Sequence, residues 1–318
     1  MGITKNHLFL PTVLTIFITS LANAMEVDYR KPQGGKYNNP LVNNVEKLFN
    51  KIPTDPIHLA AWENDKVDWP RYTFSDENEK GIQNHFQGIA RLSEYLGVGQ
   101  YIVLSGGNSH EKISDLFIIK MGSQDPEELW SENTKNGKPK KGSDKIVAHI
   151  EIDKTGYWHA GGMQTCGKYL AIPLEGRGSK VVFYDISNPE NPKKLNVYLK
   201  REGQGQGGAV AFTRLANGQF LLAIWQDKYG LDFYCSVSDS IDDGFEKIGS
   251  VSGEKIKNLV GRKDFPEYQM INFVQETSGN IYLIGTRSLA VLKNRPPASA
   301  KSRRRLQVND CLLQLPVA

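Results

Sequence analysis

A repeated pattern in the middle of the chain constrains the fold more than any other feature of the sequence. Four segments begin with small residues, continue with a Gly-containing turn and an apolar run, and three of them add a second apolar run. Matching positions in the four segments are Ile89, Met163, Val210 and Ile271. Short apolar and β-branched runs bounded by Gly, Asn and Asp are typical of β-strands. The pattern therefore predicts an all-β fold built from similar groups of strands.

The matching positions lie 74, 47 and 61 residues apart. A β-propeller blade takes about 40–50 residues, so the longer spacings require inserted loops. Residues 131–145 are polar and have no hydrophobic period, which predicts one such loop. We expect a β-propeller-like domain over residues 85–292 with about four recognisable units.

The fourth unit is expected to lack its third strand. That strand would fall at about residues 294–300, but residues 294–305 contain Pro296, Pro297 and a dense run of basic residues. Proline and repeated like charges both oppose strand pairing. We expect residues 293–318 to form a disordered basic tail and the propeller to be incomplete at the C-terminus. A truncated or frame-shifted ending and a natural basic tail are the two explanations that the sequence leaves open.

One unit carries a more specific pattern. Residues 181–193 read VVFYDISNPENPK: an apolar strand, an Asp that can cap the following turn, and two prolines that end the strand. This segment resembles the repeat of exported bacterial β-propellers of the LVIVD type, in which an apolar strand ends in D-I-S-N-P-x-x-P. The resemblance is confined to this segment. It implies a propeller and no particular activity.

The first 24 residues have the layout of a secretory signal peptide. They carry Lys5, an apolar run over residues 8–21 and the small-x-small site Ala22-Asn23-Ala24. An uncleaved membrane anchor is the alternative, although the apolar run is shorter than the ~20 residues that span a bilayer. Since no later segment could cross a bilayer, we expect a periplasmic or secreted protein that begins at Met25.

The N-terminal segment, residues 25–84, differs from the repeats. Apolar residues spaced by three and four positions from Val42 to Phe49 predict a short helix before Pro53. Residues 57–62 predict a strand, and residues 63–84 a charged loop.

The distribution of charge argues against a nucleic-acid partner. Of the net charge of +4, residues 293–318 hold +5 and residues 1–24 hold +1, which leaves −2 for residues 25–292. A nucleic-acid-binding protein would carry its basic residues on a folded face, interleaved with aromatic residues. We therefore expect no nucleic-acid partner.

Two glycine-rich motifs have better structural than functional interpretations. Residues 203–208 read GQGQGG and satisfy the dinucleotide motif G-x-G-x-x-G, but the following residues, from Ala209, predict a strand and not the helix that phosphate binding needs. The segment is interpreted as a connection between units. Residues 162–169 come close to a P-loop, but Tyr169 replaces the required Ser or Thr and a strand again follows.

The sequence offers no strong metal motif. Asp239, Asp242 and Asp243 lack the ligand spacing of a calcium-binding EF-hand loop. The three cysteines, at positions 166, 235 and 311, show no C-x-x-C spacing, and Cys235 is expected to be a buried free thiol.

Propeller topology predicts where a ligand would bind. The start of the first strand and the end of the second strand of each unit lie on one face, which commonly carries the site. This placement selects His85, His159, Asn108, Glu175, Arg177, Asp227 and Arg287 as candidate ligand-binding residues, with Gln206, Gln226 and Glu267 at equivalent positions. No metal is predicted, and His85 and His159 are only weak metal candidates.

Three functions remain open at this point. The first is an exported β-propeller that binds a small molecule, a peptide, a glycan or a small anion at this face without catalysis. The second is a metal-dependent hydrolase or oxidase, and the third a structural or assembly protein of the cell envelope. No G-x-S-x-G or H-E-x-x-H motif sharpens the enzyme hypothesis. The cofactor and the oligomeric state stay unassigned.

Overall fold

The computed structural model describes residues 14–15, 41–49, 61–62, 84–92, 100–109, 111–121, 144–201, 206–226, 230–259, 268–286 and 311–315. Within these ranges most residues lie in strands, and the strands form four sheets. Helices are few and short: α1 (Val45–Phe49), α3 (Gly253–Leu259) and the 3-10 helix η4 (Ile241–Asp243). The predicted all-β class is confirmed.

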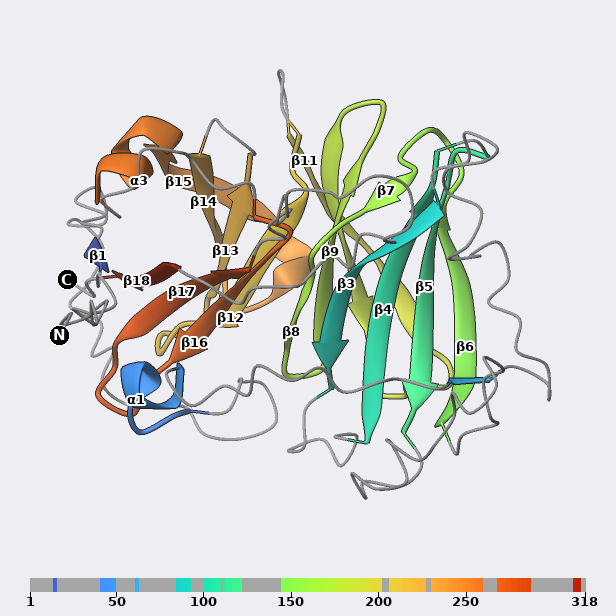
Figure 1. Cartoon of the computed structure of the whole chain (residues 1–318), viewed down its shortest axis with the longest axis horizontal. Helices are drawn as coiled ribbons and strands as arrows, with labels where there is room; N and C mark the ends of the chain where they lie inside the picture. The colour runs from blue at the N-terminus through green and yellow to red at the C-terminus, as the bar shows by residue number, and fades with distance from the viewer. Residues whose placement is uncertain are drawn as a thin grey trace, which may run out of the picture.

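Apart from the short β1 and β2, each sheet is built from strands that follow one another in the chain (Figure 1). The first sheet contains β3 (Asn84–Arg91), β4 (Tyr101–Asn108), β5 (Ile113–Lys120) and β6 (Asp144–Asp153), with the short β2 (Ala61–Trp62) parallel to β6. The second contains β7 (His159–Ala160) and β8 (Gln164–Cys166), which both pair with β9 (Tyr169–Glu175), then β10 (Ser179–Asp185) and β11 (Lys193–Arg201).

The third sheet contains β12 (Ala209–Arg214), β13 (Phe220–Trp225), β14 (Gly230–Ser236) and β15 (Phe245–Ser252). The fourth contains β16 (Met270–Gln275), β17 (Ile281–Thr286) and β18 (Cys311–Leu315), with β1 (Leu14–Thr15) parallel to β18. Consecutive strands from β3 to β6, from β9 to β11, from β12 to β15 and from β16 to β18 are antiparallel. In Figure 1 the four sheets lie side by side in chain order.

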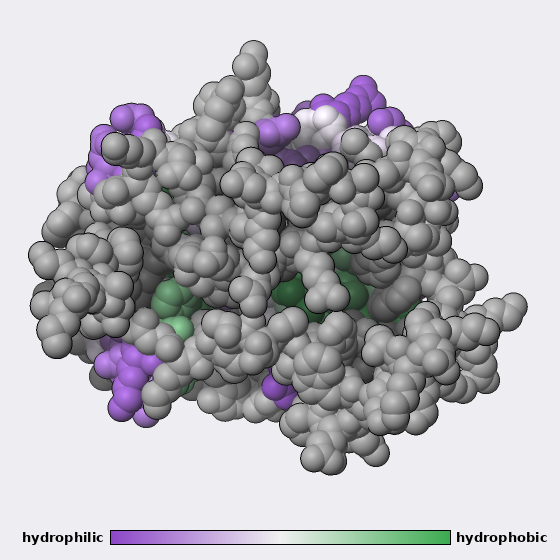
Figure 2. Space-filling model, in the orientation of Figure 1, coloured by the Kyte–Doolittle hydropathy of each residue, from purple (hydrophilic) through white to green (hydrophobic). Residues whose placement is uncertain are grey.

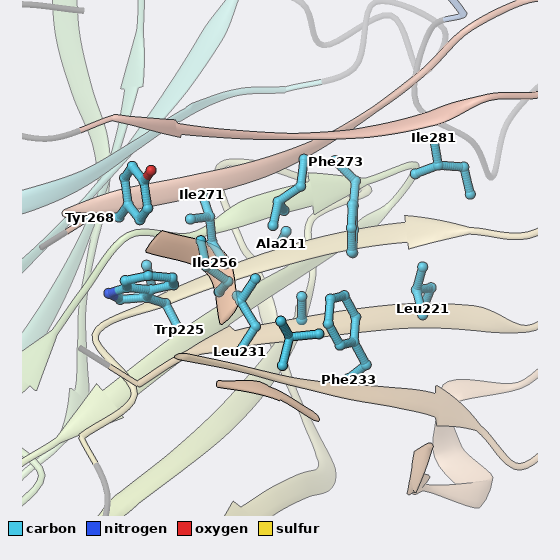
Figure 3. Packing of buried hydrophobic residues seen from close by; sticks show 14 of the residues in the cluster. Ala211, Leu221, Trp225, Leu231, Phe233, Ile256, Tyr268, Ile271, Phe273 and Ile281 are labelled. Carbon is cyan, nitrogen blue, oxygen red and sulfur yellow. The ribbon is translucent and has the colours of Figure 1, made fainter. Parts of the chain in front are cut away.

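Hydrophobic side chains fill the space between neighbouring sheets. Strand β13 is buried along its whole length because both of its faces are covered. Leu222 and Ile224 belong to the cluster shared with the second sheet, whereas Leu221 and Trp225 belong to the cluster shared with the fourth. Figure 3 shows the latter cluster, in which Phe233 lies opposite residues of β16. Among the coloured residues of Figure 2, the largest hydrophobic area shows toward the middle, and most hydrophilic residues show nearer the rim.

The first strands of the sheets approach one another through glycines. A Cβ on Gly161 would collide with the carbonyl oxygen of Gly208, and one on Gly162 would collide with that of Gln269. A Cβ on Gly88 would lie 2.5 Å from the carbonyl oxygen of Gly161. The first strands are therefore packed backbone to backbone, and only glycine permits this approach.

The turn after β10 has the structure that its sequence predicts. Asp185 Oδ1 accepts a hydrogen bond of 2.8 Å from the Ser187 N–H, and Asn188 Oδ1 accepts one of 3.1 Å from the Glu190 N–H. These side chains hold the turn that leads into β11.

The N-terminal segment contacts both the last and the first sheet. Val42 lies beside β16, where its N–H donates to the Gln275 carbonyl at 3.0 Å, and Val45 at the start of α1 packs against Tyr282. Strand β2 pairs with β6 at the outer edge of the first sheet. Helix α1 and strand β2 therefore agree with the predicted helix and strand, and residues 57–60 of the predicted strand lie outside the described residues.

Two expectations about the strands were wrong. The first three sheets each have an additional outer strand, β6, β11 or β15, and residues 144–145 belong to β6 and not to the predicted loop. The fourth sheet does have a third strand, because β18 pairs with β17 from Gly285↔Cys311 to Ile281↔Leu315. The basic run ends at Arg305, and the sequence CLLQL beyond it is apolar enough to pair. The rest of residues 293–318, like most of residues 1–24, lies outside the described residues.

The helices in the described ranges are too short and too polar to cross a membrane.

Candidate functional site

Four polar residues form a row across the second sheet at one end of its strands. His159 pairs with Glu175, Glu175 with Ser179, and Ser179 with Arg201 in the strand register. Directly paired residues of neighbouring antiparallel strands point to the same face and lie about 5 Å apart. We call His159, Glu175, Ser179 and Arg201 the polar row. Its side chains lie at one end of the sheet face that packs against the third sheet.

His159 and Glu175 form the more exposed half of the polar row. His159 Nδ1 lies 2.6 Å from Glu175 Oε2, and their side chains are 18% and 12% exposed. A carboxylate bound to one ring nitrogen holds the imidazole in a fixed orientation. The half-buried Trp158 lies beside this pair, with its ring centroid 5.3 Å from that of His159.

Arg201 is buried at the other end of the polar row and connects the row to the third sheet. Its Nη2 lies 2.6 Å from Asp232 Oδ2, and its Nη1 donates to the Gln206 carbonyl at 2.8 Å. Asp232 also accepts hydrogen bonds from Ser250 Oγ, Lys247 Nζ and the side-chain amide of Gln226.

Neighbouring groups stabilise the ionised form of the Asp232 carboxyl group in spite of its burial. Burial by itself raises the pKa of this carboxyl group, but hydrogen bonds from Lys247 and Ser250 and the charges of Arg201 and Lys247 outweigh it. The pKa of Asp232 therefore lies below its ordinary value. The guanidinium of Arg201 already has a counter-charge, so it does not need an anionic ligand.

Three adjacent members of the polar row have a buried polar atom without a hydrogen-bond partner among the described residues. These atoms are Glu175 Oε1, Ser179 Oγ and Arg201 Nε. Leaving a buried donor or acceptor unpaired costs about 1–3 kcal/mol of stability. Three such atoms in a continuous row are therefore expected to meet a water molecule or a ligand.

Two glycines at the start of the third sheet cover the polar row. A Cβ on Gly207 would collide with Ser179 Oγ. A Cβ on Gly208 would lie 3.3 Å from Glu175 Oε2 and 3.5 Å from Oε1, so the glycine backbone packs closely over the carboxylate. Ala209 directly opens β12, in agreement with the expectation that residues 203–208 connect two units and precede no helix.

The structure describes some of the other predicted site residues and places them differently from one another. The backbone of His85 pairs with Gly107, where an added Cβ would lie 3.1 Å from His159 Cα, so this backbone runs close to the polar row. The side chain of His85 lies outside the described part of the structure. Asn108 is buried, and its Oδ1 accepts a hydrogen bond from the Glu111 N–H in the β4–β5 turn. Arg177 is exposed in the turn after β9. Asp227, Glu267 and Arg287 are not among the described residues.

Sequence reasoning missed Ser179, Arg201 and Asp232. A serine at the start of an apolar strand carries no local signal, and Arg201 ends a strand of alternating polarity that was not predicted. Asp232 offered a signal, because an acidic residue inside the apolar run of β14 must have a buried partner.

Metal and thiol chemistry find little support in the described ranges. They contain no group of three His, Cys, Asp or Glu side chains placed to hold a metal ion. Asp242 and Asp243 belong to η4, and Asp243 accepts a hydrogen bond from Ser238 Oγ. Cys166 and Cys235 are buried free cysteines, as expected for Cys235, and burial raises the pKa of the Cys235 thiol to about 11.

Comparisons with known proteins give little further information. No protein-family model and no curated protein matches the chain. Among solved structures 23 chains match. One of them is the apo form of prolyl oligopeptidase B from Galerina marginata, with 10% identity and a TM-score of 0.29. The match covers 64% of this chain and 24% of that enzyme, so the chain corresponds to about a quarter of the enzyme's length.

Proposed function

We propose that the chain is an exported β-propeller-like protein that binds a small polar ligand at the polar row and performs no catalysis there. Four sheets of consecutive strands, packed face to face in chain order, support the propeller-like arrangement. The LVIVD-like segment, residues 181–193, and the signal-like N-terminus support export.

One observation carries the binding proposal. Glu175 Oε1, Ser179 Oγ and Arg201 Nε belong to residues that are consecutive in the register of one sheet, and each atom lacks a hydrogen-bond partner in the part of the chain that the structure describes. In a sequence selected only for stability, these atoms would have hydrogen-bond partners or would be replaced by apolar groups. Ligand hydrogen bonds would offset the cost of leaving them unpaired.

Ligand screening tests the binding proposal. We expect members of a small-molecule library to raise the Tm of the purified protein and to have less effect on Glu175→Gln. Glu151→Gln is the control, because Glu151 lies on β6, outside the polar row. The proposal fails if no compound stabilises the protein, or if every stabilising compound acts equally on Glu175→Gln.

An enzyme is the second candidate, and the His159–Glu175 pair favours it. In metal-binding histidines, the N–H of the second ring nitrogen commonly donates a hydrogen bond to a carboxylate, which orients the ring. Elemental analysis of the purified protein separates the two candidates. We expect no stoichiometric transition metal, whereas a metal that is lost in His159→Ala would favour the hydrolase or oxidase.

Export is tested separately, by N-terminal sequencing of protein recovered outside the cytoplasm. We expect it to begin at Met25. Retention of Lys5 in that material would contradict cleavage after Ala24.

A further inference from the structure

Three lysine side chains share the face of the second sheet that is turned toward the first sheet. Lys180 on β10 pairs directly with Lys200 on β11, so these two side chains point to the same face. Lys194 points there as well, because it pairs with Tyr184, which lies four residues beyond Lys180 on β10. Val182 and Tyr184 of this face pack against the first sheet. We call Lys180, Lys194 and Lys200 the lysine cluster.

Two ammonium groups of the lysine cluster lie against neighbouring residues of β6. Lys180 Nζ lies 2.6 Å from Asp153 Oδ2, and Lys194 Nζ donates a hydrogen bond of 2.9 Å to the Ile152 carbonyl. Both groups therefore lie at the end of β6. Burial and the positive charge of Lys180 lower the pKa of Lys194, although the charge of Asp153 opposes this change. This repulsion agrees with the short separation of the two ammonium groups.

The lysine cluster carries more positive than negative charge. Among the described residues, only Asp153 forms an ion pair with it. Burial alone would raise the pKa of Asp153, but hydrogen bonds from Lys180 and Thr155 outweigh burial and lower it, so this carboxylate is ionised. One carboxylate faces three ammonium groups. Because like charges on directly paired residues such as Lys180 and Lys200 destabilise a sheet, a bound anion would relieve this repulsion.

The lysine cluster is open to the solvent and adjoins an aromatic ring. Lys194 and Lys200 are exposed, and the side chain of Lys180 is 16% exposed. Tyr198 pairs with Val182 on the same face, two residues before Lys200, and is 60% exposed. Its ring offers a flat apolar surface beside the ammonium groups. Such a combination suits a ligand that has both an anionic and an organic part.

The charge of the lysine cluster matches a doubly charged anion. A phosphate monoester has a second pKa of about 6, so it carries nearly two negative charges at neutral pH, and it presents three strong acceptor oxygens. Lysine binds phosphate as a point charge, without the fixed geometry that arginine requires. A carboxylate or a sulfate ester has a single charge and would leave part of the repulsion in place.

We infer that the lysine cluster binds the phosphate group of a small organic phosphate monoester, whose organic part packs on Tyr198. This site lies on the opposite face of the second sheet from the polar row, because Ser179 and Arg201 alternate with Lys180 and Lys200 along their strands. It is therefore independent of the function proposed for the polar row.

Calorimetric titration of the purified full chain tests the inference, at constant ionic strength and at pH about 7.5, where a phosphate monoester is a dianion. The probes are phenyl phosphate, inorganic phosphate, phenyl sulfate and benzyl alcohol. We expect phenyl phosphate to bind most tightly. Phenyl sulfate should bind at least about tenfold more weakly because it has one charge fewer, and benzyl alcohol should not bind measurably. Inorganic phosphate should be weaker than phenyl phosphate, because it has no group that packs on Tyr198.

Lysine variants locate the bound phosphate. Lys194→Met and Lys200→Met should each raise the Kd of phenyl phosphate about tenfold. Lys193→Met is the matched control, since Lys193 is an exposed lysine of the same strand but pairs with Asp185 and so points to the other face. The Kd of Lys193→Met should equal that of the unchanged protein. Tyr198→Ala should weaken phenyl phosphate and leave the Kd of inorganic phosphate unchanged.

Thermal unfolding separates ligand binding from a structural role of the lysines. Lys200 is exposed and has no ion pair among the described residues, so Lys200→Met should leave Tm unchanged or raise it slightly when no phosphate is present. Phenyl phosphate should raise the Tm of the unchanged protein and of Lys193→Met, and should raise that of Lys200→Met less.

Other results would overturn the inference in distinguishable ways. If Lys193→Met weakens phenyl phosphate as much as Lys200→Met does, the probe responds to overall charge and the lysine cluster is no site. If phenyl sulfate binds as tightly as phenyl phosphate, the requirement for a dianion is wrong. If inorganic phosphate binds as tightly and Tyr198→Ala has no effect, the ligand is the free ion and no monoester. If no probe binds, the inference is rejected, and the proposal for the polar row is unaffected.

Discussion

The side chain of Gln164 pairs with both backbone groups of Phe273, a residue of another sheet. Gln164 Nε2 donates to the Phe273 carbonyl at 2.8 Å, and Gln164 Oε1 accepts from the Phe273 N–H at 2.8 Å. The same Oε1 accepts from the N–H of Phe212 in the third sheet, also at 2.8 Å. One buried amide therefore joins β8 of the second sheet to β12 and β16, which are the first strands of the third and fourth sheets.

Replacing Gln164 by Met should strongly destabilise the fold. Met has a similar length but leaves three buried backbone groups without partners, and each unpaired group costs about 1–3 kcal/mol. We expect the free energy of unfolding, measured by urea denaturation, to fall by about 3 kcal/mol or more. Gln87→Met is the control, because the Gln87–Gln269 hydrogen bond is exposed and should matter by less than about 0.5 kcal/mol. Equal effects of the two substitutions would contradict the role given to Gln164.

The buried Arg201–Asp232 pair makes stability depend on pH. Because the pKa of Asp232 is lowered in the folded protein, ionisation of this group stabilises the fold above the unfolded-state pKa of about 3.9. That contribution is lost as the pH falls from about 4 through the folded-state pKa. The pKa values of Asp153, Asp185 and Glu276 are lowered as well, so their contributions are lost in the same direction.

Asp232→Asn should therefore lower Tm at neutral pH and flatten its decrease in acid. The side chains of Arg201 and Asp232 are only 7% and 5% exposed, and removing one partner of a buried pair typically costs about 3–5 kcal/mol. Asp185→Asn is the comparison, since the Lys168–Asp185 pair is 27% and 25% exposed and its loss should cost less. A pH profile of Tm that is the same in Asp232→Asn and in the unchanged protein would refute this assignment.

The sequence predicted the inner strands of the fold better than the outer ones. Strands such as β9 and β13 are covered on both faces, so nearly every residue is apolar and the run is easy to recognise. Strands β11 and β15 lie at sheet edges, where polar residues face the solvent. Their composition resembles that of a loop, and the alternating polarity of β11 was too weak to predict a strand.

The site was predicted only where neighbours in the chain form it. His159 and Glu175 are close because β7 and β9 form a hairpin-like pair, which the repeat pattern already places together. Arg201 and Asp232 meet through the packing of the second sheet on the third. No spacing rule connects such residues, because their proximity depends on side chains that fill the space between two sheets.

The C-terminal strand should contribute measurably to stability. Strand β18 pairs with β17 at five positions, and without it the edge of β17 would be unpaired. Ending the chain at Asp310 should therefore lower Tm by several degrees. Ending it at Leu315 removes only residues 316–318 and should leave Tm almost unchanged. Equal Tm values for the two truncated chains would show that β18 adds nothing to the fold.

Helix α1 should stabilise the fourth sheet through a single buried side chain. Val45 is 2% exposed and packs against Tyr282, and its N–H donates to Glu276 Oε1 at 3.1 Å. Val45→Ala keeps the hydrogen bond but removes buried methyl groups, so the free energy of unfolding should fall by about 2 kcal/mol. Leu48→Ala lies in the same helix but at a position that is 48% exposed, so urea denaturation should detect a much smaller change. If Val45→Ala were as stable as Leu48→Ala, α1 would not hold the N-terminal segment against the last sheet.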